Sequence, residues 1–327
     1  MIFHVIVNPA GASGKTGKIY RRLMPYLKKS RHRFVVHLSS EEKGIEEVTR
    51  EAVREARSGQ PAARTKKEPV NLIVLGGDGT LNEVINGIDD YSDVRIGFLP
   101  AGSGNDLARS LKLPKNLKAL SDQILEGRTV RRMDVGEVIC HDAGQEADRG
   151  WRRRFLSSCG VGYDAAICYY AGRSPFKKVL NRLHLGKLIY LVYAFRLILS
   201  YPNTGQVIYE SGRVLETFPN CLFSVYMNNR YEGGGIQFCP HADNSDGILD
   251  YCAADPKRNS EFFLIVPFTF SGKKYPFFAR TMHQGRAGRT VRVKASVPQW
   301  VHTDGEVKRR SADLTVRILP EKLQMLD

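Results

Sequence analysis

Long apolar runs, paired cysteines and compact metal motifs are missing from this 327-residue sequence. Its longest apolar stretch, residues 185–199, is interrupted by Lys187 and Arg196 and falls short of the roughly 18 apolar residues that a membrane-spanning helix needs. The six cysteines include no CxxC pair and the eight histidines no HExxH spacing, so neither a disulfide framework nor a zinc motif is indicated. The apolar run at residues 2–7 has no basic segment before it and no small-residue cleavage site after it, so we expect a cytoplasmic protein with reduced thiols.

Negative charge is also in short supply, because 49 basic residues against 34 acidic ones leave a formal charge of +15. The excess is uneven: residues 152–200 hold nine Lys or Arg and one acidic residue, Asp164. Such a field attracts anions, whether nucleic acid, acidic lipid headgroups or nucleotides, unless it serves solubility alone. The sequence shows no RNP, helix-turn-helix or zinc-finger pattern, so we expect no nucleic-acid partner.

The pattern of apolar residues changes near residue 130. Before it, buried-strand patterns alternate with amphipathic helices, which predicts an α/β domain with a parallel sheet flanked by helices over residues 1–130. After it, short strand patterns separated by turns predict a β-rich antiparallel domain over residues 131–313, with one strong helix. The last strand pattern, at residues 314–319, fits either domain, so residues 314–327 are an alternative addition to the first.

Two glycine-rich junctions follow the third and fourth strand patterns, at residues 75–83 and 99–107. Parallel sheets bind their ligands beyond the carboxyl ends of the strands, where these junctions lie. Glycines there let backbone N–H groups approach phosphate oxygens, and the helix that follows adds a positive dipole end. The motifs GxxxxGK[ST] and GxGxxG both fail, because Pro9 and Leu107 stand where each needs a glycine. Two such junctions on successive strands still predict a phosphate-binding site.

The junctions belong to a series of motifs that runs in order along nearly the whole chain. The series comprises Asn8-Pro9, Gly76-Gly77-Asp78-Gly79-Thr80, Gly102-Ser103-Gly104-Asn105-Asp106, Gly233-Gly234-Gly235 with Pro240, Asp246-Gly247 and Asp304-Gly305-Glu306. In these motifs the sequence resembles the catalytic domain of bacterial diacylglycerol and other lipid kinases, which is related to sphingosine kinases and, more distantly, to NAD kinases. The resemblance implies a NAD-kinase-like α/β domain, and the last motif favours lipid kinases over NAD kinases.

The resemblance also implies where ATP binds. The residues that it assigns to ATP are Asn8, Pro9, Ala10, Gly11, Ala12, Ser40, Gly76, Gly77, Asp78, Gly79, Thr80, Leu81, Asn82 and Ser103. The family often has Thr in place of Ser40 and Ser103, and Ser39 is the alternative to Ser40. Asp78 is expected to organise nucleotide and metal, whereas Lys15 and Arg21 are either phosphate partners or ordinary surface cations.

For phosphoryl transfer, the resemblance assigns the general base to Glu306, with Asp304 as the alternative catalytic carboxylate. A carboxylate takes a proton only from a hydroxyl within hydrogen-bond reach. The same Asp-Gly pair is a good hairpin signature, and a turn is a suitable place to present such a group.

The family has a second Mg²⁺ site on an Asp-Gly turn, away from the chemistry. It maps onto the Asp246 side chain and the backbone carbonyls of Asp243 and Ile248, and Mg²⁺ prefers such oxygen ligands. A plain Asx turn is the alternative. Asp134, near the predicted domain boundary, either binds a substrate hydroxyl or caps a strand.

An apolar stripe raises the question of membrane contact. It falls at residues 185, 188, 189, 192, 195 and 199, and it either packs in a core or contacts lipid. Basic residues cluster nearby in the sequence, each worth about 1 kcal/mol at an anionic surface: Arg152, Arg153, Arg154, Arg173, Lys177, Lys178 and Arg182. Phe277-Phe278 beside Lys273-Lys274 is a second candidate contact. We expect reversible, peripheral association with the anionic inner face of the membrane.

These observations predict an ATP-dependent, Mg²⁺-requiring lipid kinase that phosphorylates a hydroxyl of a diacylglycerol-like lipid alcohol, with its active site between the two domains. The enzyme alternatives are an NAD kinase and a sphingoid-base kinase, and the non-enzyme alternative is a nucleotide-binding lipid sensor. Members of the family form homodimers, so a homodimer is the alternative to a monomer.

Overall fold

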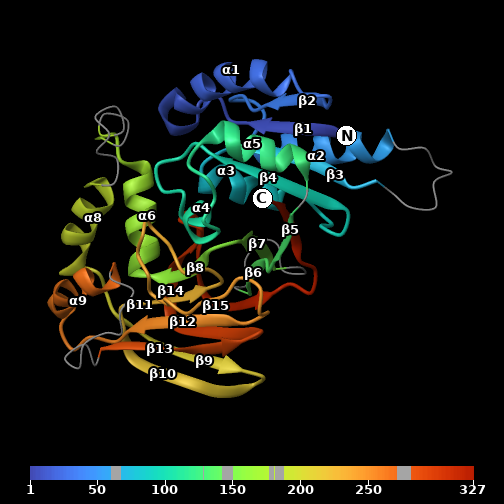
Figure 1. Cartoon of the computed structure of the whole chain (residues 1–327). Coiled ribbons are helices and arrows are strands. Elements are labelled where there is room, and N and C mark those ends of the chain that lie inside the picture. The colour runs from blue at the N-terminus through green and yellow to red at the C-terminus, as the bar shows by residue number, and fades with distance from the viewer. Residues whose placement is uncertain (60–67, 128, 142–149, 177–179, 181–187, 271–280) are drawn as a thin grey trace. The chain divides into compact units, whose positions relative to one another are not determined.

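The computed structural model describes the chain except residues 60–67, 128, 142–149, 177–179, 181–187 and 271–280 (Figure 1). The chain forms two compact units, the first made of residues 1–133 and 320–327 and the second of residues 134–319. Each unit has a sheet of its own. Among the described helices, none is long and apolar enough to cross a membrane.

The first unit is built on a six-stranded sheet with the order β2-β1-β3-β4-β16-β5. Its strands are β1 (Ile2–Val7), β2 (Arg33–Leu38), β3 (Val70–Gly76), β4 (Val94–Pro100), β5 (Val130–Met133) and β16 (Leu323–Leu326). Neighbours run parallel except β5, which pairs antiparallel with β16. Every residue of β3 is buried, as expected of a parallel strand covered on both faces. The predicted parallel α/β fold is confirmed.

Helices cover both faces of this sheet (Figure 1). They are η1 (Gly11–Gly14), α1 (Lys15–Leu27), α2 (Ile45–Ser58), α3 (Asp78–Asn86), α4 (Asp106–Ser110) and α5 (Leu117–Glu126). Phe3, Val5 and Val7 of β1 share a core with α1 and α5. Because side chains alternate along a strand, His4 and Ile6 point to the opposite face, where α2 contacts β1 and β2.

The second unit contains a ten-stranded sheet. Eight of its strands follow the order β13-β12-β11-β8-β14-β15-β6-β7, and the other two are β9, which pairs with β14, and β10, which pairs with β9. Its strands are β6 (Gly136–Cys140), β7 (Trp151–Phe155), β8 (Ser158–Gly162), β9 (Thr204–Glu210), β10 (Arg213–Cys221), β11 (Phe223–Met227), β12 (Leu249–Ala254), β13 (Met282–Gly288), β14 (Thr290–Thr303) and β15 (Glu306–Ile318). All of its recorded pairings are antiparallel, so the prediction of a β-rich antiparallel second half is confirmed.

The second unit has more helix than the sequence predicts. Its described helices are α6 (Tyr163–Arg173), α8 (Leu188–Ile198), η2 (Asn259–Glu261) and α9 (Phe262–Thr269). The expectation of one strong helix was wrong, because the small and aromatic residues of α6 carry little helical periodicity. Tyr163, Ile198 and Phe262 from these three α-helices share a core with Phe223 of β11.

The end of the chain is divided between the units. The strand pattern at residues 314–319 lies largely in β15, which pairs with β14 and β6 in the second unit. Beyond it, residues 323–326 enter the first sheet as β16, between β4 and β5. The chain therefore passes from one unit to the other twice.

Candidate active site

The two glycine junctions lie against each other at the carboxyl ends of β3 and β4. A Cβ added to Gly102 would lie 2.6 Å from the Gly77 Cα, and one added to Gly77 would lie 3.0 Å from the Gly102 Cα. A backbone hydrogen bond from Ala101 to Gly76 (2.7 Å) and the Asn105 side chain, bonded to the Gly102 N–H and C=O (both 3.1 Å), hold the loops in place. Backbone approaches this close require glycine, and they leave a surface that is suited to phosphate oxygens.

Asp78 and Asp106 face this junction from the first turns of α3 and α4. The Asp78 Oδ2 accepts a hydrogen bond from the Asp106 backbone N–H (3.1 Å), and Asp106 pairs with Arg109. A Cβ on Gly104 would lie 3.0 Å from the Asp78 Oδ2 and 3.6 Å from the Asp106 Oδ2, so both carboxylates border the same glycine. Asp106 was not among the predicted site residues. Its position immediately after the second glycine loop was the signal for it, since that is where a helix begins.

The other residues predicted to bind ATP in the first unit follow the neighbouring strands β1 and β2. Ala12 and Ser13 adopt left-handed φ values of 49° and 56°, a strained backbone for non-glycine residues that clusters at functional sites. The Ser39 backbone N–H donates to the carbonyl of Val7 (3.0 Å), immediately before Asn8. The Ser40 hydroxyl accepts from the Lys43 N–H (3.1 Å) and closes a local turn.

The side chains of Leu81 and Asn82 are buried in α3, and Ser103 is exposed at the tip of its loop.

The Asp304-Gly305 pair forms a tight turn between β14 and β15. Both residues have positive φ, 50° and 81°, as a two-residue hairpin of this composition requires. The Asp304 carboxylate accepts hydrogen bonds from the backbone N–H groups of Leu156 (2.9 Å), Ser157 (2.7 Å) and Ser158 (3.0 Å). Asp304 thus anchors the β7–β8 turn, whereas the Glu306 side chain is exposed.

A buried ionisable cluster lies beneath this turn. The His302 Nε2 is 2.9 Å from the Asp164 Oδ2 and 3.0 Å from the Glu232 Oε1. Burial alone would lower the pKa of His302, but the two carboxylates outweigh it and hold this pKa well above its usual value. The Gly305 N–H donates to the His302 Nδ1 (3.2 Å), a contact that favours the neutral ring. The two carboxylates have the larger effect on the pKa of His302, which stays raised. No local sequence pattern marks this cluster, because its members are distant in the chain.

Asp134 and the Asp246 turn lie together in the second unit. The buried Asp134 carboxylate accepts from the Gly247 N–H (2.7 Å), which is a capping contact. The Asp246 Oδ1 accepts from the Ile248 N–H (3.0 Å), and its Oδ2 pairs with Arg286. The geometry is that of an Asx turn, and the exposed Arg286 offsets the charge of Asp246. A second Mg²⁺ site on this turn stays a prediction. The Asp243 carboxylate likewise bonds the Ser245 N–H (3.0 Å) and hydroxyl (2.6 Å).

An open groove of about 560 Å³ lies elsewhere in the second unit, along the β9–β10 turn and β14. Three cations, Arg289, Arg292 and Lys294, line it, but none of the predicted site residues does. Arg292 is paired with Asp313 across β14 and β15.

Comparison with known proteins matches these elements to one family. Residues 3–138 match the diacylglycerol kinase catalytic domain, and residues 157–327 match the YegS C-terminal NAD kinase beta sandwich-like domain. The chain therefore belongs to the diacylglycerol kinase family. The resemblance inferred from the motifs is confirmed.

Individual relatives agree with this assignment. A diacylglycerol kinase of Staphylococcus saprophyticus is 34% identical over 308 residues, 92% of this chain and 88% of the relative. A diacylglycerol kinase of Mycobacterium tuberculosis is 29% identical over 216 residues, and the match spans 64% of this chain and 63% of that protein's length.

Two solved structures share the fold. The structure of a Bacillus anthracis diacylglycerol kinase superposes with a TM-score of 0.66 at 18% identity, covering 99% of this chain and 96% of the other. A yeast NADH kinase in complex with NADH gives a TM-score of 0.52 at 11% identity, covering 100% of this chain and 83% of the other.

Proposed function

We propose that this protein is an ATP-dependent lipid kinase that transfers the γ-phosphate of ATP to a hydroxyl of a diacylglycerol-like lipid. The observation that carries the proposal is the backbone contact of the two glycine loops beside Asp78 and Asp106. A carboxylate exposed on a tight hairpin, Glu306, supports it from the second unit. We propose that both units supply residues to the reaction.

In this proposal the first unit holds the nucleotide. The backbone N–H groups of residues 76–79 and 102–104 bind phosphate oxygens, since the glycines remove the side chains that would keep the phosphates away. The loop at residues 8–12 and Ser39 or Ser40 extend this site along β1 and β2. Asp78 and Asp106 supply hard oxygen ligands that fit Mg²⁺, which when bound offsets the charge of the phosphates.

Glu306 acts on the acceptor. Its carboxylate accepts the proton of the lipid hydroxyl as the oxygen forms a bond to the γ-phosphorus, and the bond from that phosphorus to the β-bridging oxygen breaks to release ADP. Asp304 positions the hairpin through the β7–β8 turn.

The test is transfer of label from γ-labelled ATP with Mg²⁺ to lipid alcohols in mixed micelles, with NAD as a parallel acceptor. We expect label in a chloroform-extractable product, lost in Glu306→Gln and Asp78→Asn and kept in the control Glu321→Gln, whose carboxylate is exposed and lies outside the proposed machinery. A panel with diacylglycerols and sphingoid bases separates the two lipid-kinase readings. Label in NADP alone would assign the protein to the NAD kinases. ATP binding without transfer to any acceptor would indicate a nucleotide-binding sensor.

We further propose that the enzyme reaches its acceptor by reversible contact with an anionic membrane through α8. Five apolar residues of this helix and its end are 43–76% exposed: Leu188, Leu191, Val192, Phe195 and Leu199. Their spacing places them on one face, while Ile189 and Ile198 are buried. Of the predicted stripe, residues 188, 192, 195 and 199 are thus exposed, residue 189 lies in the protein interior, and residue 185 lies outside the described residues.

The basic residues expected to assist are only partly described. Arg173 packs over the Tyr169 ring at 4.0 Å, and Arg152, Arg153 and Arg154 lie in β7, the last strand in the sheet order. The remaining predicted contacts lie outside the described residues: Lys177, Lys178, Arg182, Lys273, Lys274, Phe277 and Phe278.

A further inference from the structure

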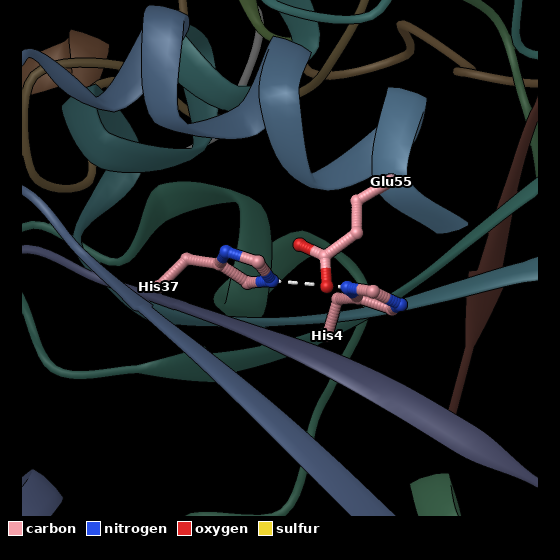
Figure 2. Close-up of side chains that lie close together, drawn as sticks. All are labelled: His4, His37 and Glu55. Atoms are coloured by element: carbon pink, nitrogen blue, oxygen red, sulfur yellow. Dashed lines mark hydrogen bonds between the residues drawn. The ribbon is translucent and has the colours of Figure 1, made fainter. Parts of the chain in front are cut away.

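Three potential metal ligands meet beneath α2, on the face of the first sheet opposite α1 and α5. They are His4 of β1, His37 of β2 and Glu55 of α2 (Figure 2). The His4 Nδ1 and the His37 Nε2 are 2.9 Å apart, and one ligand atom from each of the three residues lies within 4.8 Å of the other two. The two imidazole planes are nearly parallel, at 14°.

The fold accounts for this convergence. In the parallel register of β1 and β2, His4 pairs with Val35 and Ile6 pairs with His37. His4 and Ile6 are two residues apart and share a face of the sheet, so both histidines point to the face that α2 covers. Glu55 follows the buried Val48 and Ala52 at helical spacing, so it lies at the end of the helix face that covers the strands, with its own side chain exposed. Figure 2 shows the Glu55 side chain descending from the helix toward the two rings on the strands.

The surroundings favour ligand nitrogens that carry a lone pair. Burial, and for His4 the neighbouring His37, lowers the pKa of both imidazoles, while Glu55 raises the pKa of each by a smaller amount. The other charged groups that face His37 are Glu51 and Lys43, which pair with each other. His4 is 5% exposed, His37 is half-buried and Glu55 is exposed, so the cluster opens to solvent on one side.

We propose that His4, His37 and Glu55 bind a divalent transition-metal ion, with Zn²⁺ the first choice. Two imidazoles and one carboxylate are a recurring zinc donor set, with water in the fourth position, and the open side leaves room for that water. Tetrahedral Zn–N bonds of about 2.0–2.1 Å place two nitrogens about 3.3 Å apart, so the rings need to separate by about 0.4 Å from their hydrogen-bonded distance. The bridging proton also moves away, and the rings turn until both lone pairs point at the ion. Imidazole ligands favour Zn²⁺, Cu²⁺ or Ni²⁺ over Mg²⁺, which sets this site apart from the proposed nucleotide site.

The bound ion would tie the edge strand β2 to β1 and α2. His37 lies one residue before Leu38, where β2 ends, and Ser39 and Ser40 follow at once. The site therefore stabilises the segment that leads into the proposed nucleotide loop. Its ligands come from three elements, with 32 residues between His4 and His37, which is why no compact motif marks it in the sequence.

The experiment uses the full chain, freed of metal by a chelator and titrated with Zn²⁺ by calorimetry, then with Co²⁺ monitored by its visible absorption. We expect one Zn²⁺ per chain at this site, an intense tetrahedral-type Co²⁺ spectrum and a higher Tm for the zinc-bound protein. Loss of a ligand should weaken zinc binding by more than about 10-fold, because even outer-shell partners of metal ligands are worth 10–100-fold.

The variants are His37→Gln and Glu55→Gln, both at positions accessible enough to be tolerated, with His32→Gln and Glu47→Gln as matched controls on the same strand region and helix. The proposal expects weakened binding and loss of the Co²⁺ spectrum in the first pair alone. Equal zinc binding by all four variants would place the ion elsewhere and overturn the proposal. Absence of zinc binding by the parent chain would leave a hydrogen-bonded imidazole pair and overturn it as well.

Discussion

Asp304 and Glu306 are two residues apart in the sequence, but the structure gives them different surroundings. The Asp304 carboxylate accepts hydrogen bonds from three backbone N–H groups of the β7–β8 turn, and the Glu306 side chain is exposed at the start of β15. A carboxylate committed to three donors holds a turn in place, whereas an exposed one can accept a substrate proton. The difference separates structural from chemical effects of substitution.

Glu306→Gln should lower kcat by about 10²–10⁴-fold, the usual contribution of a general base, and leave the free energy of unfolding within about 0.5 kcal/mol of the parent. Asp304→Ala should lower the free energy of unfolding by at least about 2 kcal/mol, because buried N–H groups lose a charged acceptor. Kinase assays and urea unfolding of both variants measure this. Strong activity in Glu306→Gln, together with an inactive and fully stable Asp304→Asn, would exchange the two roles.

At the scale of elements, the glycine loops depend on backbone contact. A Cβ on Gly102 meets the Gly77 Cα at 2.6 Å, and because the obstacle is backbone, no side chain can move aside to make room. Gly102→Ala should therefore cost about 1–3 kcal/mol of stability and weaken ATP binding. The control Gly172→Ala places its Cβ in open space within α6 and should be neutral or stabilising by up to about 1 kcal/mol. Unfolding curves and nucleotide titrations compare the two, and an unaffected Gly102→Ala would count against the close approach.

The exposed face of α8 is a second element with a testable role. The double variant Val192→Ser and Phe195→Ser should reduce binding to anionic vesicles by at least about 10-fold, because burying each apolar side chain is worth about 1.5–3 kcal/mol. Val214→Ser, an exposed valine of β10, is the matched control and should bind as the parent does. Vesicle sedimentation with anionic and neutral lipid measures this, and equal binding by parent and double variant would exclude α8 as the contact.

Local patterns predicted the elements better than the contacts between them. The strand patterns and the glycine loops were visible because apolar runs and glycine turns are local signals. Helix α6 was missed for want of periodicity, and the His302 cluster because Asp164 and Glu232 lie 138 and 70 residues before the histidine. Whether a carboxylate such as Asp246 faces a metal or Arg286 depends on a strand 40 residues away, which no local pattern records.

At the scale of the whole molecule, the chain leaves the first unit at residue 133 and returns at residue 320. The returning strand β16 lies between β4 and β5, with Leu323, Met325 and Leu326 buried. The first unit thus depends on residues that follow the whole second unit. Without β16, the edges of β4 and β5 that pair with it would have unpaired backbone groups.

Met325→Ala should destabilise the first unit by about 2–5 kcal/mol, the usual cost of truncating a buried Met. Glu321→Ala, at an exposed position beside the strand, should change stability by less than about 0.5 kcal/mol. Thermal unfolding with and without a non-hydrolysable ATP analogue measures both, since the ligand identifies the transition of the nucleotide-binding unit. Equal melting of the two variants would show that β16 contributes little.

The late return of β16 also has a consequence for biosynthesis. A ribosome makes residues 134–319 before it makes the strand that completes the first sheet, so the nascent first unit lacks β16 while the second unit can already fold. Translation that stops before β16 yields a chain in which β4 and β5 lack their partner strand. Such unpaired strand edges favour aggregation and binding by chaperones. Only a chain read through residue 326 contains every strand of the first sheet as the structure describes it.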